Sequence, residues 1–326
     1  MSGQARAFWV TEPGKGAILP EALGEPRPGE VTVRACWSGI SRGTESLVFA
    51  GRVPPSEWER MRAPFQAGDF PAPVKYGYAS VGLVEAGPTD LIGRHVFVLF
   101  PHQTRYHVPV SAVRAVPDGV PPSRAVLAAN LETAVNGIWD ADVQPGDRVT
   151  VIGGGTVGCL VTWLAARIPG CEVTLVDVNP ARAGIARTLG AAFATPEHAT
   201  EGADVVIHAS GHPSGLALGL RLAGLEARVV EMSWYGDTTV PLALGGAFHA
   251  RRLSLISSQV GRIPATRAAR WDYDRRMQLA LRLLQEPALE ALITGEDDFL
   301  ALPEVMARLT TAPGDTLCHR IRYSQD

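Results

Sequence analysis

The chain has 326 residues, of which 30 are basic and 33 are acidic, and its formal net charge is −3. This balance gives no reason to expect a nucleic acid or an anionic membrane as a partner. The length accommodates two domains, and a hydrophobic fraction of 46% is enough to bury a sizeable core.

The cysteines and the N-terminal sequence bear on whether the protein is secreted or stays in the reducing cytoplasm. Cys36, Cys159, Cys171 and Cys318 form no C-x-x-C pair, which suits free thiols in a reducing environment. The N-terminal sequence MSGQARAFWV lacks the charged and apolar regions of a signal peptide. The sequence also lacks a run of about 18 apolar residues that would span a bilayer. We therefore expect a cytoplasmic protein without a membrane segment.

Residues 1–122 are rich in proline and glycine and contain short runs with the character of strands. These runs are EVTVRACWSGI, ASVGLVEAG, HVFVLF and RYHVPV. Turn residues separate them, which is typical of a compact β-rich domain.

The pattern changes at residue 123. Residues 123–141 have the apolar period of a helix, and from Gly146 onward short apolar strands alternate with helices. This alternation predicts a parallel, doubly wound α/β sheet with helices on both faces, over residues 123–265. The run RRLSLISSQVG fits an edge strand of that sheet. Residues 266–326 begin with a long predicted helix and include a second amphipathic helix, LPEVMARLTTA.

A glycine motif lies between the first strand and the first helix of this sheet. The sequence VTVIGGGTVGCL supplies G-x-G-x-x-G as Gly153, Gly155 and Gly158. In this context Gly153 permits a tight turn, Gly155 lets a pyrophosphate approach, and Gly158 lets the helix lie close to the strand. The helix start, with Thr156 and Val157, offers N–H groups to the anion. These features predict a Rossmann dinucleotide site.

The next predicted strand ends in Asp177, which follows Gly158 by 19 residues. A carboxylate at this place accepts both ribose hydroxyls of NAD and repels the 2′-phosphate of NADP. We therefore predict NAD(H) as the cofactor, with Asn179 and Arg182 beside Asp177 among the cofactor-binding residues. The alternative is a structural glycine turn in which Asp177 only caps the following helix.

The order of the two domains, together with GDRVTVIGGGTVG…VDVNPARAGIARTLGA, resembles the medium-chain dehydrogenase/reductase superfamily, which is related to the zinc alcohol dehydrogenases. The resemblance implies a GroES-like β-rich catalytic domain over 1–122, completed by 266–326. It also implies a Rossmann NAD-binding domain over 123–265 and an active site in a cleft between them.

Zinc in that superfamily is held by residues that this chain replaces. Ser41 and Tyr78 stand where the resemblance places a cysteine and a histidine ligand, and Glu132 is the one donor near the third ligand position. Replacing soft or nitrogen ligands removes most of the affinity for zinc. We therefore expect no zinc. His102 and His107 are further residues of metal-ligand type, at spacings that match no motif.

Tyr78 stands near the position that the metal would occupy. A phenol there donates a hydrogen bond to a carbonyl oxygen and passes a proton, with Ser41 and Thr44 as a relay and Glu45 to orient them. As a base at neutral pH it needs a lowered pKa, for which Lys75, Arg42 or the oxidised nicotinamide are candidate cations. The alternative for Tyr78 is packing in the cleft wall.

Four further positions complete the predicted site. Arg42 occupies a place where relatives use a basic residue against the coenzyme pyrophosphate, and Arg320 is assigned a similar part. Ser210 and Gly211 follow the strand DVVIHA where the nicotinamide ribose is expected to pass. His208, inside that strand, is interpreted as a satisfied core histidine.

The first functional reading is a zinc-independent, NAD(H)-dependent oxidoreductase that interconverts a secondary alcohol and a ketone or aldehyde. Zinc-free reduction of an enone or quinone C=C bond is the alternative reaction. A silent NAD(H)-binding redox sensor or structural subunit is the alternative of another class. The stretches ACWSGISRGTESLVFAGRVPP and YGYASVG resemble the bacteriochlorophyllide dehydrogenases. The superfamily resemblance further implies a small-molecule substrate and a homodimer joined through edge strands.

Overall fold

A computed structural model describes residues 5–324, and they form two compact units. Of the described residues, the first unit draws on 5–129, 281–286 and 293–324, and the second on 130–280 and 287–292. Residues 1–4 and 325–326, which the predicted first domain included, lie outside the described part.

The first unit is built on two sheets of mostly antiparallel strands. The smaller sheet has the order β2-β1-β5-β4, with bounds Lys15–Glu21, Ala5–Glu12, Val74–Lys75 and Ala67–Gly68. The larger sheet has the order β16-β17-β3-β6-β7-β9, with β8 pairing with β3. Its strands are β3 (Glu30–Ile40), β6 (Ser80–Ala86), β7 (His95–Val98), β8 (Arg105–Pro109), β9 (Arg114–Ala115), β16 (Ile293–Asp298) and β17 (Cys318–Arg322). The predicted β-rich domain is confirmed.

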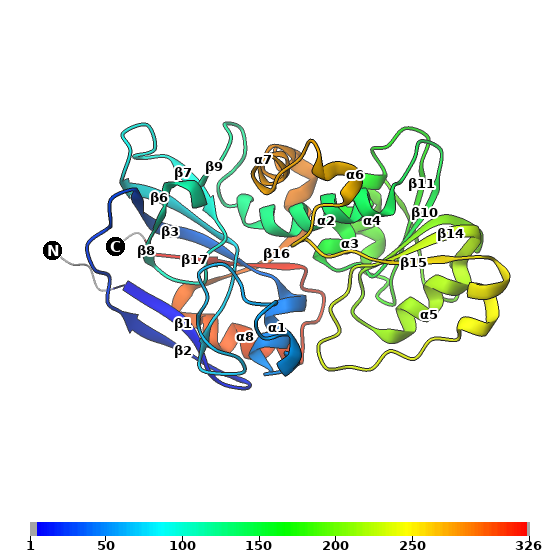
Figure 1. Cartoon of the computed structure of the whole chain (residues 1–326), viewed down its shortest axis with the longest axis horizontal. Helices are drawn as coiled ribbons and strands as arrows, with labels where there is room; N and C mark the ends of the chain where they lie inside the picture. The colour runs from blue at the N-terminus through cyan, green and yellow to red at the C-terminus, as the bar shows by residue number, and fades with distance from the viewer. Residues whose placement is uncertain (1–4, 325–326) are drawn as a thin grey trace. The chain divides into compact units, whose positions relative to one another are not determined.

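Two α-helices lie wholly within this unit. Helix α1 (Arg42–Phe49) and helix α8 (Leu302–Thr311) pack on each other, and α8 also covers β2 (Figure 1). Helix α8 buries Leu302, Val305, Met306 and Leu309, the spacing of one apolar helix face. Single-turn helices lie at Pro55–Glu57, Val110–Ala112, Ala125–Leu127 and Phe299–Ala301.

The second unit contains a parallel sheet of six strands in the order β12-β11-β10-β13-β14-β15. Its strands are β10 (Arg148–Ile152), β11 (Glu172–Val176), β12 (Ala192–Ala194), β13 (Ala203–His208), β14 (Ala223–Glu231) and β15 (Ser254–Ser257). Helices α3 (Thr156–Ala165) and α4 (Arg182–Leu189) cover one face, and α5 (Pro213–Leu222) covers the other (Figure 1). Both faces of the central strands are therefore buried, which explains their continuous apolar sequences. The predicted doubly wound sheet is confirmed.

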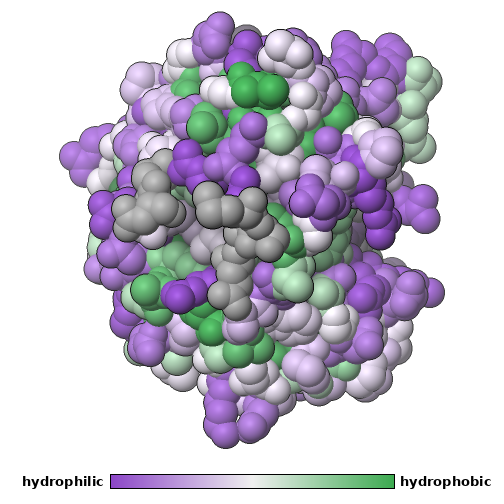
Figure 2. Space-filling model, turned by 90° about the vertical axis from the view of Figure 1, so that its left-hand side faces the viewer, coloured by the Kyte–Doolittle hydropathy of each residue, from purple (hydrophilic) through white to green (hydrophobic). Residues whose placement is uncertain are grey.

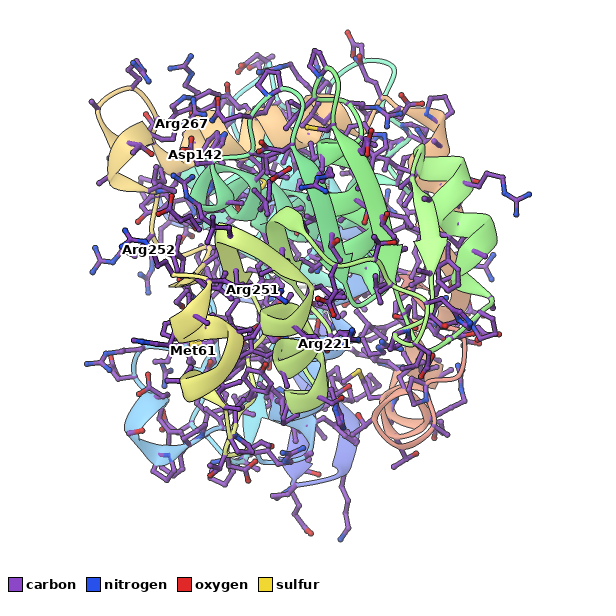
Figure 3. The ribbon with its side chains drawn as sticks, turned by 90° about the vertical axis from the view of Figure 1, so that its right-hand side faces the viewer. Met61, Asp142, Arg221, Arg251, Arg252 and Arg267 are labelled. Atoms are coloured by element: carbon purple, nitrogen blue, oxygen red, sulfur yellow. The ribbon has the colours of Figure 1, made fainter. Side chains whose placement is uncertain are left out.

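Strand β15, within the run predicted as an edge, lies at one edge of this sheet. Arg251 and Arg252, which are labelled in Figure 3, come shortly before this strand, and both form ion pairs within the second unit. Arg251 binds Glu201 at 3.1 Å, and Arg252 binds Glu226 at 2.8 Å. A π-type turn, Leu244–Phe248, precedes this segment.

Two helices cross the limits between the units: α2 (Ala128–Ala141) and α7 (Tyr273–Leu283). The Arg276 side chain of α7 is 2% exposed and binds Glu132 of α2 at 3.0 Å. Arg276 also donates to Asn136. A buried guanidinium requires such partners, which places residues 266–280 in the second unit instead of the predicted first domain. The short helices α6 (Ala265–Ala268) and Pro287–Leu292 also belong to the second unit.

The surface seen in Figure 2 intersperses hydrophilic and hydrophobic residues and shows no continuous apolar belt. None of the helices within residues 5–324 combines the length and the apolar composition needed to cross a bilayer.

Candidate functional site

The glycine loop of the second unit connects β10 to α3 by a close backbone approach. Gly153 has φ +104°, and a Cβ atom there would lie 2.6 Å from the backbone of Ser210. A Cβ atom on Gly158 would lie 1.8 Å from the carbonyl oxygen of Gly153. Both positions therefore require glycine, and the helix packs against the loop as a dinucleotide site needs.

Helix α3 begins at Thr156, after Gly155 in an extended conformation, and no side chain caps this end. The N–H groups of its first turn, which includes Val157, consequently have no side-chain acceptor. Such a helix start favours an anion through its N–H groups and its dipole. The loop and helix together fit the pyrophosphate of a dinucleotide.

Asp177 lies after β11 and is tied to the same loop. Its carboxylate accepts the backbone N–H of Gly154 and, at 2.8 Å, that of Asn179. Arg182 of α4 is 6% exposed and packs beside Gly154. The contact with Asn179 caps the following turn, which is the structural role considered for Asp177. The contact with Gly154 also places the carboxylate beside the glycine loop, where a bound dinucleotide would lie.

Ser210 and Gly211 are exposed after the carboxyl end of β13, next to Gly153. His208, within β13, is fully buried and fully hydrogen-bonded, as expected for a core histidine. Its shortest hydrogen bonds are to Glu231 and Ser210, and the hydroxyls of Ser233 and Tyr235 each lie 3.3 Å from its Nδ1. The sequence reading missed Glu231, because it lies on another strand 23 residues away.

The first unit brings together the four residues predicted to be catalytic. The Tyr78 hydroxyl is hydrogen-bonded to the side chains of Ser41 and Thr44 at the start of α1, and the Glu45 charge acts on it. Glu45 is 3% exposed, and its carboxylate accepts the backbone N–H of Ser41 at 2.8 Å. Tyr78 follows Gly77, which has φ +135° and lies against His102. The residues were predicted as a set, and they are neighbours.

A buried chain of hydrogen bonds continues from this cluster. His102 is 1% exposed, and its Nε2 lies 2.8 Å from Glu45 Oε2. Its Nδ1 lies 2.6 Å from Ser38 Oγ, which in turn is 2.9 Å from the Tyr323 hydroxyl. The sequence reading treated His102 as a metal-type residue and missed Ser38 and Tyr323. His107 is not in this chain, because Thr32 and the carbonyl of Gly24 bind its ring.

The environment of Tyr78 raises its pKa to about 12. Burial is the largest cause and the negative charge of Glu45 adds to it, while Ser41 and Thr44 act in the opposite direction. The predicted cations do not oppose this shift. Lys75 binds Gln103 at 2.7 Å and Glu21 at 3.2 Å, and Arg42 donates to the carbonyl of Thr316. At neutral pH Tyr78 is therefore a neutral phenol, a hydrogen-bond donor and not a base.

The side chains at the predicted ligand positions do not fit a zinc ion. Ser41 and Tyr78 offer neutral hydroxyls, and the Glu132 carboxylate is bound by Arg276. Within residues 5–324, no group of three histidine, cysteine, aspartate or glutamate side chains is arranged to hold a metal. Zinc requires thiolate, imidazole or carboxylate donors converging on one point.

The two predicted pyrophosphate arginines are both engaged inside the first unit. Arg42 begins α1 and binds Thr316 at 3.0 Å. Arg320, on β17, pairs with Glu296 and donates to the carbonyl of Ser123 at 3.2 Å. The charge of the Arg320 guanidinium is thus balanced by the Glu296 carboxylate, which argues against the predicted role of Arg320 in binding the coenzyme pyrophosphate.

Replacing Gly158 with alanine tests the close packing of loop and helix. The added Cβ meets the carbonyl oxygen of Gly153, so the helix must shift away from the loop. We expect the affinity for NADH to fall at least tenfold, which corresponds to about 1.4 kcal/mol. Titration of NADH fluorescence measures it.

Gly184→Ala is the matched control, because Gly184 is exposed on α4 and nothing lies within 4 Å of an added Cβ. This variant should keep the NADH affinity and raise the free energy of unfolding by about 0.4–1 kcal/mol. Unchanged NADH affinity in Gly158→Ala would show that the loop does not hold the dinucleotide.

No protein-family model matches the chain. Among curated proteins, D-guloside 3-dehydrogenase from Escherichia coli (strain K12) is 28% identical over 309 residues, which cover 84% of this chain and 87% of that protein. The chain is also similar to 2-desacetyl-2-hydroxyethyl bacteriochlorophyllide A dehydrogenase from Rhodobacter capsulatus, with 30% identity over 179 residues, 49% of this chain and 52% of that protein.

Solved structures of dehydrogenases share the fold over nearly the whole chain. A short chain alcohol dehydrogenase from Escherichia coli CFT073, complexed with NADH, has a TM-score of 0.76 at 18% identity and covers 98% of this chain and 100% of that one. A candidate zinc-binding dehydrogenase from Sinorhizobium meliloti 1021, bound to NADP, has a TM-score of 0.78 at 18% identity, with 98% and 99% covered. The chain has the fold of these dehydrogenases, and it is an alcohol dehydrogenase-like oxidoreductase.

Proposed function

We propose that the chain is a zinc-independent, NAD(H)-dependent oxidoreductase that interconverts a secondary alcohol and a ketone or aldehyde. The observation that carries this proposal is the hydroxyl cluster of Tyr78, Ser41 and Thr44, held by the buried Glu45. The nicotinamide supplies or accepts the hydride, and the protein supplies the proton and the hydrogen bonds.

Tyr78 performs the electrostatic work that a metal performs in zinc enzymes. In the direction of reduction, its O–H donates to the carbonyl oxygen and stabilises the negative charge that develops there. A phenol with a pKa of about 12 is still more acidic than an aliphatic alcohol, so it passes its proton to the new alkoxide. Ser41 and Thr44, which hydrogen-bond the phenol, are placed to return a proton to it.

The name of one curated relative supports a proposal for the class of substrate. This relative, which matches 84% of the chain, is named for dehydrogenation at position 3 of a guloside. We therefore propose to begin the search for a substrate with glycosides that carry free secondary hydroxyls. Reduction of enones but not of ketones would favour the alternative reaction, and tight NADH binding without any turnover would favour a silent binding protein.

Tyr78→Phe tests the central step, since it removes the hydroxyl and keeps the ring. We expect kcat to fall by about 10²–10³-fold with little change in KM, because the lost donor acts in the transition state. Steady-state kinetics with the best glycoside of the screen measures it.

Tyr76→Phe is the control, since Tyr76 packs edge-on against Tyr78 and its hydroxyl donates to the carbonyl of Met61 at 3.4 Å. It should leave kcat unchanged. A Tyr78→Phe enzyme as fast as Tyr76→Phe would remove Tyr78 from the mechanism.

We propose NAD(H) over NADP(H) because Asp177 places a carboxylate beside the glycine loop. A carboxylate there accepts ribose hydroxyls and repels a 2′-phosphate. The loop geometry alone fits either cofactor, so the choice rests on this one charge.

NADH should bind at least about tenfold more tightly than NADPH, and Asp177→Asn, which removes the charge, should narrow that ratio. Parallel fluorescence titrations of both nucleotides give the two affinities. Tighter binding of NADPH by the unchanged protein would refute the preference.

A further inference from the structure

The carboxyl ends of β13 and β14 hold a serine, a histidine and a glutamate in one line of hydrogen bonds. Ser210 Oγ lies 2.6 Å from His208 Nε2, and His208 Nδ1 lies 2.7 Å from Glu231 Oε2. His208 is fully buried, whereas Ser210 is exposed between β13 and α5. A nucleophile, a base and an orienting carboxylate in this order are the arrangement that activates a serine.

The surroundings of Glu231 fix the direction of these hydrogen bonds. The carboxylate accepts the backbone N–H of Ser233 at 2.6 Å and the Tyr235 hydroxyl at 2.8 Å. Burial raises the pKa of Glu231, but the hydrogen bonds from His208 and Ser233 outweigh it and hold that pKa below its usual value. An ionised carboxylate only accepts, so His208 Nδ1 carries a proton. With the proton on Nδ1, the Nε2 atom of His208 accepts a hydrogen bond from the Ser210 hydroxyl.

The fold keeps space free for this pair. A Cβ atom on Gly215 would lie 2.4 Å from His208 Nε2 and 2.5 Å from Ser210 Oγ. Helix α5 therefore approaches the pair closely only because residue 215 is a glycine.

We propose that Ser210 is a nucleophilic serine, activated by His208 and Glu231, that takes an acyl group from activated carboxylic esters or a phosphonyl group from fluorophosphonates. With an ester, Ser210 Oγ forms a bond to the acyl carbon and its proton passes to His208 Nε2. The bond to the leaving alkoxide then breaks, and His208 returns the proton to that oxygen. The products are acyl-Ser210 and an alcohol. This reaction does not depend on hydride transfer.

Both the uptake and the release of an acyl group pass through an oxyanion, and the neighbouring N–H groups that could stabilise it are engaged. The N–H of Gly211 donates to Ser233, that of His212 donates to Ser210 Oγ itself at 3.1 Å, and that of Ser214 donates to the His212 ring. Residue 213 is a proline. Few donors are thus left to stabilise the oxyanion, which normally contributes a factor of about 10²–10³. The reaction of Ser210 therefore requires an activated acyl or phosphonyl donor, and hydrolysis of the acyl-serine is slow.

A biotin-tagged fluorophosphonate tests the proposal on the full chain, with peptide mass spectrometry to locate the label. Oγ forms a bond to phosphorus, fluoride leaves, and His208 takes the proton. The internal control is Ser214, an exposed serine that lies 2.8 Å from His212 Nδ1; among residues 5–324, His212 hydrogen-bonds no carboxylate. We expect label on Ser210 and none on Ser214 under the same conditions.

His208→Gln retains a polar side chain but no base, and it should slow labelling of Ser210 at least about 100-fold. Gly215→Ala should slow it as well, by pushing the pair apart. Thermal melting confirms that each variant is folded. Labelling of Ser210 no faster than of Ser214 in the unchanged protein overturns the proposal without any variant, and an undiminished rate in folded His208→Gln overturns it too.

Discussion

The hydrogen bond between Glu45 and His102 holds the candidate active site of the first unit together. Both side chains are almost completely buried, and a buried carboxylate is stable only with partners that satisfy its charge. Glu45 meets this need through His102 on one oxygen and the backbone N–H of Ser41 on the other. The same contacts fix the start of α1, and with it Ser41 and Thr44 around the Tyr78 hydroxyl.

In the proposed mechanism this arrangement replaces a metal. In a zinc enzyme the ion polarises the substrate oxygen. The proposal gives that task to a neutral phenol, which burial and, to a lesser extent, the charge of Glu45 keep protonated. The acidic residue that helps to keep the phenol protonated is thus the same residue that organises the hydroxyls around it. A zinc ion polarises the substrate oxygen through its own positive charge and does not require a protonated hydroxyl group for this step.

The fold and the glycine loop of the second unit could be predicted from local sequence patterns. The strand, turn, helix and acid around Gly153 and Asp177 follow one another within about thirty residues, and each step has a steric or electrostatic reason that the sequence displays. The β-rich first unit and the parallel sheet were likewise predictable from short apolar runs. Tyr78, Ser41 and Glu45 were predictable as a set only through the resemblance to a family, because two segments of the chain supply them.

Contacts between distant segments were not predictable. Ser38 and Tyr323 are 285 positions apart and share one hydrogen bond. The ion pair of Arg276 in α7 with Glu132 in α2 ties residues 266–280 to the second unit. The sequence of neither helix indicates this pair. Lys75 stands three positions before Tyr78, yet its side chain points to Gln103 and Glu21. Proximity in sequence therefore suggested the wrong charged group: the charge that acts on the pKa of Tyr78 is that of Glu45.

The zinc content of the purified, catalytically active protein tests the central claim most directly. Elemental analysis and turnover are measured on the same sample, before and after treatment with a strong chelator. A zinc-independent mechanism predicts far less than one zinc per chain and a rate that the chelator leaves unchanged. One zinc per chain, lost together with activity on chelation and restored with it, would contradict that mechanism.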